Sequence, residues 1–169
     1  DVWLDDIGHP PMGPVNVTEL SKPQAVMDDG TVKVSCTLVK HTPIFKSLAY
    51  RFDTPGRSIT FSGDTSPVQS VVDLAKGCDV LVHEAIYPNP NQAAATVPAL
   101  NGGGDARIDR REPGSAIAGD AAKLLQHVVS SHTPVEEAGR IAQEAGVKTL
   151  VLAHTVSLMP GVTDGMWIA

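Results

Sequence analysis

Titratable side chains stand at the end of three apolar runs in this chain. Residues 62–65 present Asp64, residues 81–85 present Glu84, and residues 151–155 present His154. In open α/β structures, catalytic and binding groups collect where strands end, because the strand fixes the backbone while the residue after it faces a crevice. A fourth segment opens a helix and adds one more titratable group, His132. Together these four junctions predict a metal-dependent hydrolytic site.

Asp64 and His154 are the candidate metal ligands. Asp64 follows a strand and a glycine, so its carboxylate is expected in the open. Carboxylate oxygens and neutral imidazoles are the usual non-sulfur ligands of zinc, which keeps an open position for water in catalytic sites. As an alternative, Asp64 caps the helix that starts near Pro67, although Ser66 is better placed for that task. His154 taken alone is typical of a structural histidine, and its pairing with Asp64 favours a metal.

Glu84 and His132 are the candidate acid–base pair. Glu84 directly follows His83, so in an extended strand only one of them faces the site. A carboxylate beside an imidazole fixes the tautomer of the ring and raises its basicity, as an acid–base dyad requires. A surface position in a loop is the alternative for His132. His41 ends the first predicted strand and is expected to look into the substrate pocket, whereas His127 is expected to pack locally.

The elements that must position these groups alternate in type. Period-two alternation predicts strands, and apolar residues at i, i+3, i+4 and i+7 predict helices. The helix at 133–145 is the best specified, with Thr133 as N-cap, Pro134 in its first turn, Glu136 completing a capping box and Gly146 as the stop. The class is therefore α/β. The predicted strands are 31–40, 47–53, 57–62, 79–83 and 147–153, and the other predicted helices start near Pro67 and Ala116.

Two segments fall outside this alternation. Residues 1–30 are rich in proline and predict an irregular arm, with at most a short edge strand near residues 15–20. Residues 87–113 contain three prolines and three successive glycines, and predict a long loop or lid. At 169 residues the whole chain is long enough for one domain, so 1–169 is interpreted as a single unit that includes both segments.

Composition narrows the range of partners. The formal net charge is −6 and the basic residues form no stripe, which disfavours nucleic acid and favours a small-molecule substrate. No apolar run approaches the roughly 20 residues that span a bilayer, so no membrane association is expected. Cys36 and Cys78 lie in strand-like runs and are expected to be buried free thiols. Without a signal peptide, the sequence does not distinguish a cytoplasmic from a periplasmic location.

The motifs together resemble the metallo-β-lactamase fold hydrolases, in particular the branch that contains RNase Z and arylsulfatase-like enzymes. The resemblance implies an αββα sandwich, of which this chain is similar to the C-terminal half. It also implies two zinc ions, with manganese or iron as alternatives, bridged by Asp64 and bound by His154. Glu84 and His132 then correspond to the pair that assists proton delivery, and a metal-bound hydroxide is the nucleophile. The matching segments are 39–41, 49–53, 62–65, 82–85, 131–133 and 152–154.

The chain departs from the family pattern at its start. The first metal motif of the family, His-x-His-x-Asp-His, occurs nowhere in it. A further ligand histidine is expected before the matched region, and a closing strand is expected after Trp167. One aspartate and one histidine cannot complete a four-coordinate zinc site. We therefore expect a complementing N-terminal half or a homo-oligomer to supply the missing ligands, or a chain that is poor in metal and inactive.

These observations predict a zinc-dependent hydrolase acting on an ester-type bond. The ester is an aryl sulfate, a carboxylic ester or a phosphoric ester, and the acidic charge of the chain favours a small molecule. A tRNA 3′-end endoribonuclease is the alternative enzyme, since the same acid–base pair suits it. The third hypothesis is a non-catalytic fragment of such a domain, which would expose an apolar sheet face and bind a partner instead.

Overall fold

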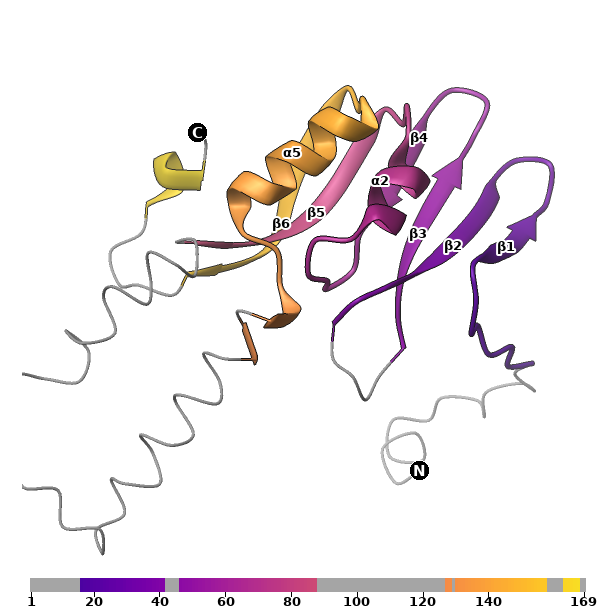
Figure 1. The fold of residues 1–169 in the computed structure, drawn as a ribbon. Helices are drawn as coiled ribbons and strands as arrows, with labels where there is room; N and C mark the ends of the chain where they lie inside the picture. The colour runs from indigo at the N-terminus through magenta and orange to yellow at the C-terminus, as the bar shows by residue number, and fades with distance from the viewer. Residues whose placement is uncertain (1–15, 42–45, 88–126, 129, 158–162, 168–169) are drawn as a thin grey trace, which may run out of the picture.

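A six-stranded sheet with two α-helices on one face forms the body of the molecule (Figure 1). The computed structural model describes residues 16–41, 46–87, 127–128, 130–157 and 163–167. No helix in that part of the chain is long and apolar enough to cross a membrane. The elements are β1 (Gln24–Asp28), β2 (Lys33–Val39), β3 (Ser47–Asp53), β4 (Ser58–Phe61), α2 (Gln69–Ala75), β5 (Val80–Tyr87), α5 (Val135–Ala145), β6 (Thr149–Ser157) and the short 3₁₀ helix η1 (Asp164–Trp167).

The strands follow one another in chain order across the sheet. β1 to β4 pair in antiparallel fashion, whereas β4, β5 and β6 are parallel. Parallel neighbours need a crossover, and α2 lies between β4 and β5 in the chain while α5 lies between β5 and β6. The carboxyl ends of β4, β5 and β6 therefore meet at one edge of the sheet. The predicted α/β class is confirmed, and the predicted strands 47–53 and 57–62 pair as a hairpin around the turn at residues 54–57.

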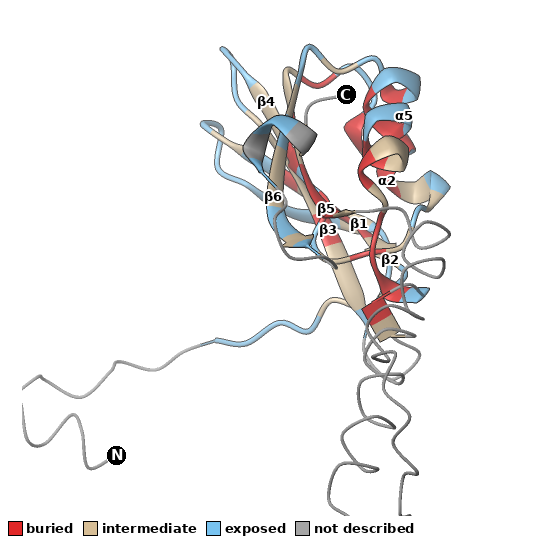
Figure 2. Ribbon diagram, turned by 90° about the vertical axis from the view of Figure 1, so that its left-hand side faces the viewer, coloured by how far each residue is buried: buried red, intermediate tan, exposed pale blue. Residues whose placement is uncertain are grey.

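The core lies between the sheet and the two helices. α2 and α5 pack side by side on the same face, with their buried residues turned toward the strands (Figure 2). Small side chains on the helices let them approach the sheet closely, and burial of this apolar surface is the main favourable term in folding. Cys78 is a buried free thiol in this core, as predicted. The core comprises Ala49, Val71, Val72, Ala75, Cys78, Leu81, Ile141, Ala142 and Ala145.

The opposite face of the sheet also carries a row of apolar side chains. Register places one such residue from each of five neighbouring strands in line across the sheet. Two members of this apolar row are 44% exposed, Phe61 and Val151. Side chains in register share a face, and the core residue Leu81 lies one position away from the row, on the helix side. The row consists of Cys36, Tyr50, Phe61, Val82 and Val151.

Several boundaries differ from those predicted. The edge strand lies at β1 and not at residues 15–20, because residues 24–28 are the ones that pair with β2. β5 and β6 run on to Tyr87 and Ser157, so Glu84 and His154 lie within strands and not after them. Of the predicted lid at 87–113, only Tyr87 is described, and most of the helix predicted from residue 116 is also outside the described residues.

The start of α5 also differs from the prediction. The helix begins at Val135 with Pro134 as its N-cap, and no side chain caps it. The predicted N-cap, Thr133, directs its hydroxyl to the carbonyl of Thr65 instead, and Glu136 forms no capping box. The predicted stop is confirmed, because Gly146 has φ +65 and closes the helix in the left-handed conformation.

Candidate active site

Asp64 reaches the carboxyl edge of the sheet on a tight turn after β4. Gly63 has φ +62, and a Cβ at this position would lie 2.7 Å from the carbonyl oxygen of Leu48. Only glycine satisfies both conditions, so this turn depends on Gly63. The turn leaves the Asp64 side chain 43% exposed, with its Oδ2 3.6 Å from Nε2 of His154. The structure thus brings together the two residues predicted to bind metal.

His154 reaches Asp64 because β6 contains a bulge. Glu84 pairs with Ala153 and Ala85 pairs with Thr155, so His154 is the extra residue in the ladder. Its φ is +47, the only positive value among the described non-glycine residues. A bulge redirects a side chain, and a residue held in a sparsely populated conformation often marks a functional site. The sequence did not indicate this bulge, which aims the His154 ring at the edge of the sheet.

Glu84 and His132 form a buried pair behind Asp64. Nδ1 of His132 lies 2.7 Å from Oε2 of Glu84, and their side chains are 7% and 2% exposed. The second carboxyl oxygen, Oε1, accepts the backbone N–H of Thr65 at 2.5 Å. Both oxygens of Glu84 are therefore engaged, and the orientation of the carboxyl group is fixed. The predicted partnership of Glu84 with His132 has the required geometry.

Burial sets the protonation of this pair. It raises the pKa of Glu84 to about 8 and lowers the pKa of His132 below its usual range. Both shifts have the same cause, since a low-dielectric surrounding disfavours the charged form of each group. At neutral pH the carboxyl group of Glu84 therefore keeps its proton and the His132 imidazole is neutral. A pair that holds a proton next to an open site is arranged for general acid chemistry.

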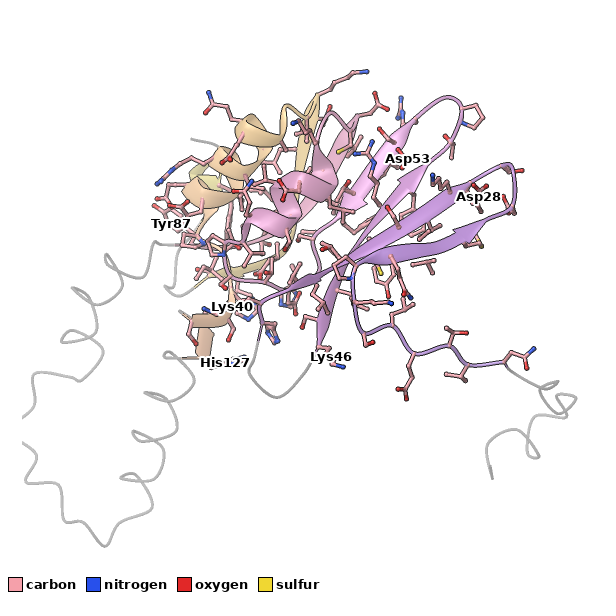
Figure 3. The ribbon with its side chains drawn as sticks, turned by 45° about the vertical axis from the view of Figure 1, so that its right-hand side comes forward. Asp28, Lys40, Lys46, Asp53, Tyr87 and His127 are labelled. Atoms are coloured by element: carbon pink, nitrogen blue, oxygen red, sulfur yellow. The ribbon has the colours of Figure 1, made fainter. Side chains whose placement is uncertain are left out.

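Three further imidazoles surround His132. Its ring meets His41 edge-on at a centroid distance of 5.1 Å and His127 edge-on at 5.9 Å, and it stacks on His154 at 5.7 Å. Figure 3 places Lys40, next to His41, and His127 at the end of the sheet opposite Asp53. His41, which the sequence predicts to look into the substrate pocket, thus lies beside the rings of His132 and His127.

His127 is the site residue that sequence reasoning missed. It was expected to pack locally, and its Nδ1 does lie 3.3 Å from Oγ of Ser131. Its ring nevertheless lies 5.3 Å from that of His41, and ligand nitrogens of His41, His127 and His132 all lie within 4.8 Å of one another. Its position five residues before His132 was the available signal, but that spacing alone does not say which way a ring points.

His83 belongs to the core and not to the site. It is fully buried, and its Nδ1 lies 2.7 Å from the carbonyl oxygen of Glu84. Its Nε2 is buried and has no hydrogen-bond partner in the part of the chain that the structure describes, and burial lowers the pKa of His83. The structure thus separates His83 from the Glu84 side chain, as expected for successive residues of a strand.

Sequence comparison identifies the family. Residues 3–155 match the family model of the beta-lactamase superfamily domain. The chain belongs to this superfamily. It is 29% identical over 165 residues to Ribonuclease Z of Mycobacterium tuberculosis H37Rv, covering 97% of this chain and 50% of that protein. It is 39% identical over 100 residues to Ribonuclease Z of Brevibacillus brevis, covering 59% of this chain and 21% of that protein. The chain thus spans half or less of these relatives.

Solved structures agree on the fold of this superfamily member. The metallo-beta-lactamase fold protein YhfI from Bacillus subtilis aligns with a TM-score of 0.53 at 20% identity, covering 85% of this chain and 43% of that one. Human tRNase Z, short form, aligns with a TM-score of 0.52 at 23% identity, covering 81% and 40%. The metallo-β-lactamase fold predicted from the motifs is therefore confirmed.

The donor atoms at this site fit a divalent metal of the kind the superfamily implies. One carboxylate and several imidazoles converge there, which is the oxygen and nitrogen donor set that zinc, manganese and iron accept. Burial lowers the pKa of His41, so this ring is neutral at pH 7 and keeps a lone pair for a metal. The donors alone do not distinguish among these metals.

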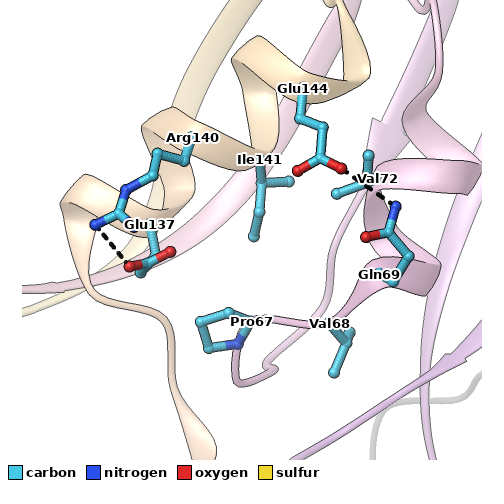
Figure 4. A pocket seen from close by; sticks show the side chains of 8 residues that line it. All are labelled: Pro67, Val68, Gln69, Val72, Glu137, Arg140, Ile141 and Glu144. Atoms are coloured by element: carbon cyan, nitrogen blue, oxygen red, sulfur yellow. Dashed lines mark hydrogen bonds and ion pairs between the residues drawn. The ribbon is translucent and has the colours of Figure 1, made fainter.

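A groove between α2 and α5 lies apart from this site (Figure 4). Its floor is apolar, with Val72 and Ile141, and its rim is polar. Gln69 donates to Glu144 over 3.5 Å, and the guanidinium of Arg140 lies 2.8 Å from the carboxylate of Glu137. The groove belongs to the helix layer, and none of the candidate catalytic or metal-binding residues lines it.

Proposed function

We propose that this chain carries the proton-delivering part of a metal-dependent phosphodiesterase of the Ribonuclease Z kind. One observation supports this most strongly, namely the buried Glu84–His132 pair beside the exposed Asp64–His154 pair. The names of the relatives favour the hypothesis of a tRNA 3′-end endoribonuclease over that of an aryl sulfate hydrolase. Cleavage of a phosphodiester needs a proton for the leaving oxygen, and this pair holds one at neutral pH.

The proposed roles follow from the contacts. Asp64 and His154, whose donor atoms lie 3.6 Å apart, would hold the metal. When bound, a divalent metal lowers the pKa of water and polarises a phosphoryl oxygen. Because the carboxyl group of Glu84 donates to Nδ1 of His132, the ring carries its own proton on Nε2.

Proton delivery then proceeds through the His132 ring. Nε2 gives its proton to the departing oxygen as the phosphorus–oxygen bond breaks, and Nδ1 takes the proton of Glu84. The ring ends neutral and Glu84 ends as a carboxylate, stabilised by the N–H of Thr65. No charge is left on the imidazole, which suits a buried position.

We propose that the residues that bind the backbone of an RNA substrate lie outside this chain. Its net charge is −6, and nucleic-acid backbones are bound chiefly by lysine and arginine. Several of the described basic side chains are already paired, as Arg51 is with Asp53, Arg140 with Glu137 and Lys148 with Asp79. The chain would therefore supply chemistry, while a basic surface elsewhere in the assembly would bind the substrate.

We also propose that the chain is one half of the αββα sandwich. The apolar row on the open sheet face is what a second sheet would cover, since sheets of a sandwich pack through their apolar faces. The relatives are at least twice as long as the matched region. The missing ligands would come from that half, or from another copy of the chain.

The test combines the chain with the half of Mycobacterium tuberculosis Ribonuclease Z that it does not cover, in the presence of zinc or manganese. The substrates are a 3′-extended tRNA, bis(p-nitrophenyl) phosphate and p-nitrophenyl sulfate. We expect both phosphodiesters to be cleaved and the sulfate to be left intact. Glu84→Gln and His132→Asn should each reduce kcat by about 10²- to 10⁴-fold, whereas Glu144→Gln on the exposed side of α5 should not.

Three outcomes would contradict the proposal. Hydrolysis of p-nitrophenyl sulfate without cleavage of a phosphodiester would favour the aryl sulfate hypothesis instead. Phosphodiester cleavage that survives both substitutions would remove Glu84 and His132 from the chemistry. A mixture that binds no metal and cleaves nothing would identify the chain as a non-catalytic fragment.

A further inference from the structure

Thr133 links two parts of the site that lie far apart in sequence. Its hydroxyl donates to the carbonyl oxygen of Thr65 over 2.6 Å, and both residues are fully buried. Its own carbonyl oxygen accepts the N–H of Ile86 in β5 at 2.8 Å. Thr133 is therefore fixed on both sides, to the turn that carries Asp64 and to the strand that carries Glu84.

These contacts close a ring around the acid–base pair. Thr65 gives its N–H to Oε1 of Glu84 and receives the hydroxyl of Thr133 on its carbonyl. Thr133 is bonded covalently to His132, whose Nδ1 meets Oε2 of Glu84. A large rotation of the His132 backbone would therefore break a member of this ring. Asp64 precedes Thr65, so the same ring ties the candidate metal ligand to the pair.

We propose that Thr133 is a positioning residue, whose hydroxyl holds His132 against Glu84 and in register with Asp64. This inference rests on the proposed function for its effect on turnover, but its effect on His132 is independent of any activity. The hydroxyl is not used to cap α5, the usual task of a threonine at this place in a helix. Among the described residues the acceptor of this hydroxyl is the Thr65 carbonyl, which leaves orientation of the site as its task.

Thr60 provides a matched control. It is another fully buried threonine, in β4, and its hydroxyl has no hydrogen-bond partner among the residues that the structure describes. Thr60→Val and Thr133→Val thus remove the same group from equally buried positions. Only the second change removes a bond of the ring, so a difference between the two variants reports the bond and not the loss of a buried hydroxyl.

The experiment compares Thr133→Val, Thr133→Ser and Thr60→Val by NMR of ¹⁵N-labelled imidazoles in the folded chain. We expect the wild type, Thr133→Ser and Thr60→Val to show one fixed His132 tautomer and a slowly exchanging proton between Nδ1 and Glu84. Thr133→Val should lose that proton signal and show averaged ring nitrogens. In the reconstituted phosphodiesterase assay, Thr133→Val should reduce kcat by about 10- to 100-fold with KM unchanged.

Unchanged His132 signals in Thr133→Val would overturn the inference. Equal loss in Thr60→Val, or no recovery in Thr133→Ser, would also overturn it, because the effect would then be one of packing. If Thr133→Val does not fold, Thr133→Ala is measured in its place. If the wild type cleaves no phosphodiester, the proposed function fails while the NMR comparison still decides the role of Thr133.

Discussion

Two carboxyl groups, one just before β5 and one in the carboxyl-terminal half of this strand, have opposite properties. Asp79, just before the strand, accepts the N–H of Ser58 at 2.7 Å and the ammonium of Lys148 at 2.6 Å. The bond from Lys148 and those from Ser58 lower the pKa of Asp79 to about 2. Glu84, five residues further on, has its pKa raised to about 8 by burial. The same strand thus holds one permanently charged carboxylate and one that keeps its proton at neutral pH.

The parallel strands thus carry a structural ion pair at their amino end and the candidate catalytic groups at their carboxyl end. At the amino end, the charge of Asp79 ties the start of β4 to that of β5 and to Lys148 before β6. It has no exchangeable proton at neutral pH and no neighbour among the candidate catalytic residues. At the carboxyl end, Glu84 faces His132 and the open edge of the sheet. Ligand and catalytic groups in α/β sheets gather at that end.

Removing the buried carboxyl group is expected to have the largest effect on stability. Glu84→Ala leaves the N–H of Thr65 and Nδ1 of His132 without a partner in a buried place. Each unsatisfied group costs about 1–3 kcal/mol, so we expect the free energy of unfolding in urea to fall by about 3 kcal/mol. Glu144→Ala, which removes an exposed carboxylate, is the control. A loss of equal size in both variants would contradict the distinction.

The turn that presents Asp64 should be nearly as sensitive. Gly63→Ala places a Cβ against the carbonyl oxygen of Leu48 and forces an alanine to φ +62. Such strain costs about 1–3 kcal/mol, measured as the shift of the urea midpoint. Gly56→Ala is the matched control, because a Cβ there meets nothing within 4 Å. Equal urea midpoints for Gly63→Ala and Gly56→Ala would contradict the prediction, because the turn at Gly63 would then accept a side chain without strain.

Asp79→Asn tests the amino end through pH. The pKa of Asp79 is lower in the folded protein than its ordinary value of 3.8. Its charge therefore stabilises the fold above about pH 4, and this stabilisation is lost as pH falls through about 2. We expect wild type and Asp79→Asn to differ in free energy of unfolding above pH 4 and to converge toward pH 2. Parallel pH profiles would contradict the assigned role of the carboxylate.

The smallest effect is expected for a surface ion pair that belongs to neither end. The Arg140 side chain is 68% exposed, and its guanidinium lies 2.8 Å from the Glu137 carboxylate one turn earlier on α5. Exposed pairs of this kind contribute less than about 0.5 kcal/mol. Arg140→Ala should leave the urea midpoint almost unchanged. A large fall of the urea midpoint in Arg140→Ala would contradict this account, because exposed charge would then stabilise the fold as strongly as buried groups do.

The sequence predicted which residues lie at the carboxyl ends of the parallel strands, but it did not predict the contacts that these residues make. Asp64, Glu84, His132 and His154 each follow an apolar run or open a helix, and parallel strand ends converge whatever their detailed register. The bulge at His154 could not be predicted, because it depends on how β6 pairs with β5 and not on local propensity. Burial of the Glu84–His132 pair likewise depends on packing from distant segments.

Thr133 is a case in which a local sequence pattern led to a wrong prediction. Its position before Pro134 is typical of an N-cap, and the prediction was wrong because a carbonyl 68 residues away in sequence is the acceptor. The position of His127 was missed for a similar reason, since its ring gains significance only from the rings beside it. Local patterns thus predicted elements and junctions, whereas contacts across the fold decide what each side chain does.

The proton on Glu84 is the central claim and can be observed directly by infrared difference spectroscopy of the folded chain. We predict a protonated carboxyl band at pH 6 that disappears as pH rises through about 8 and that is absent from Glu84→Gln. The same band should persist in Asp79→Asn, because Asp79 is already ionised. A Glu84 that is a carboxylate at pH 6 would contradict the account, since the pair would then have no carboxyl proton to pass through His132 to a leaving group.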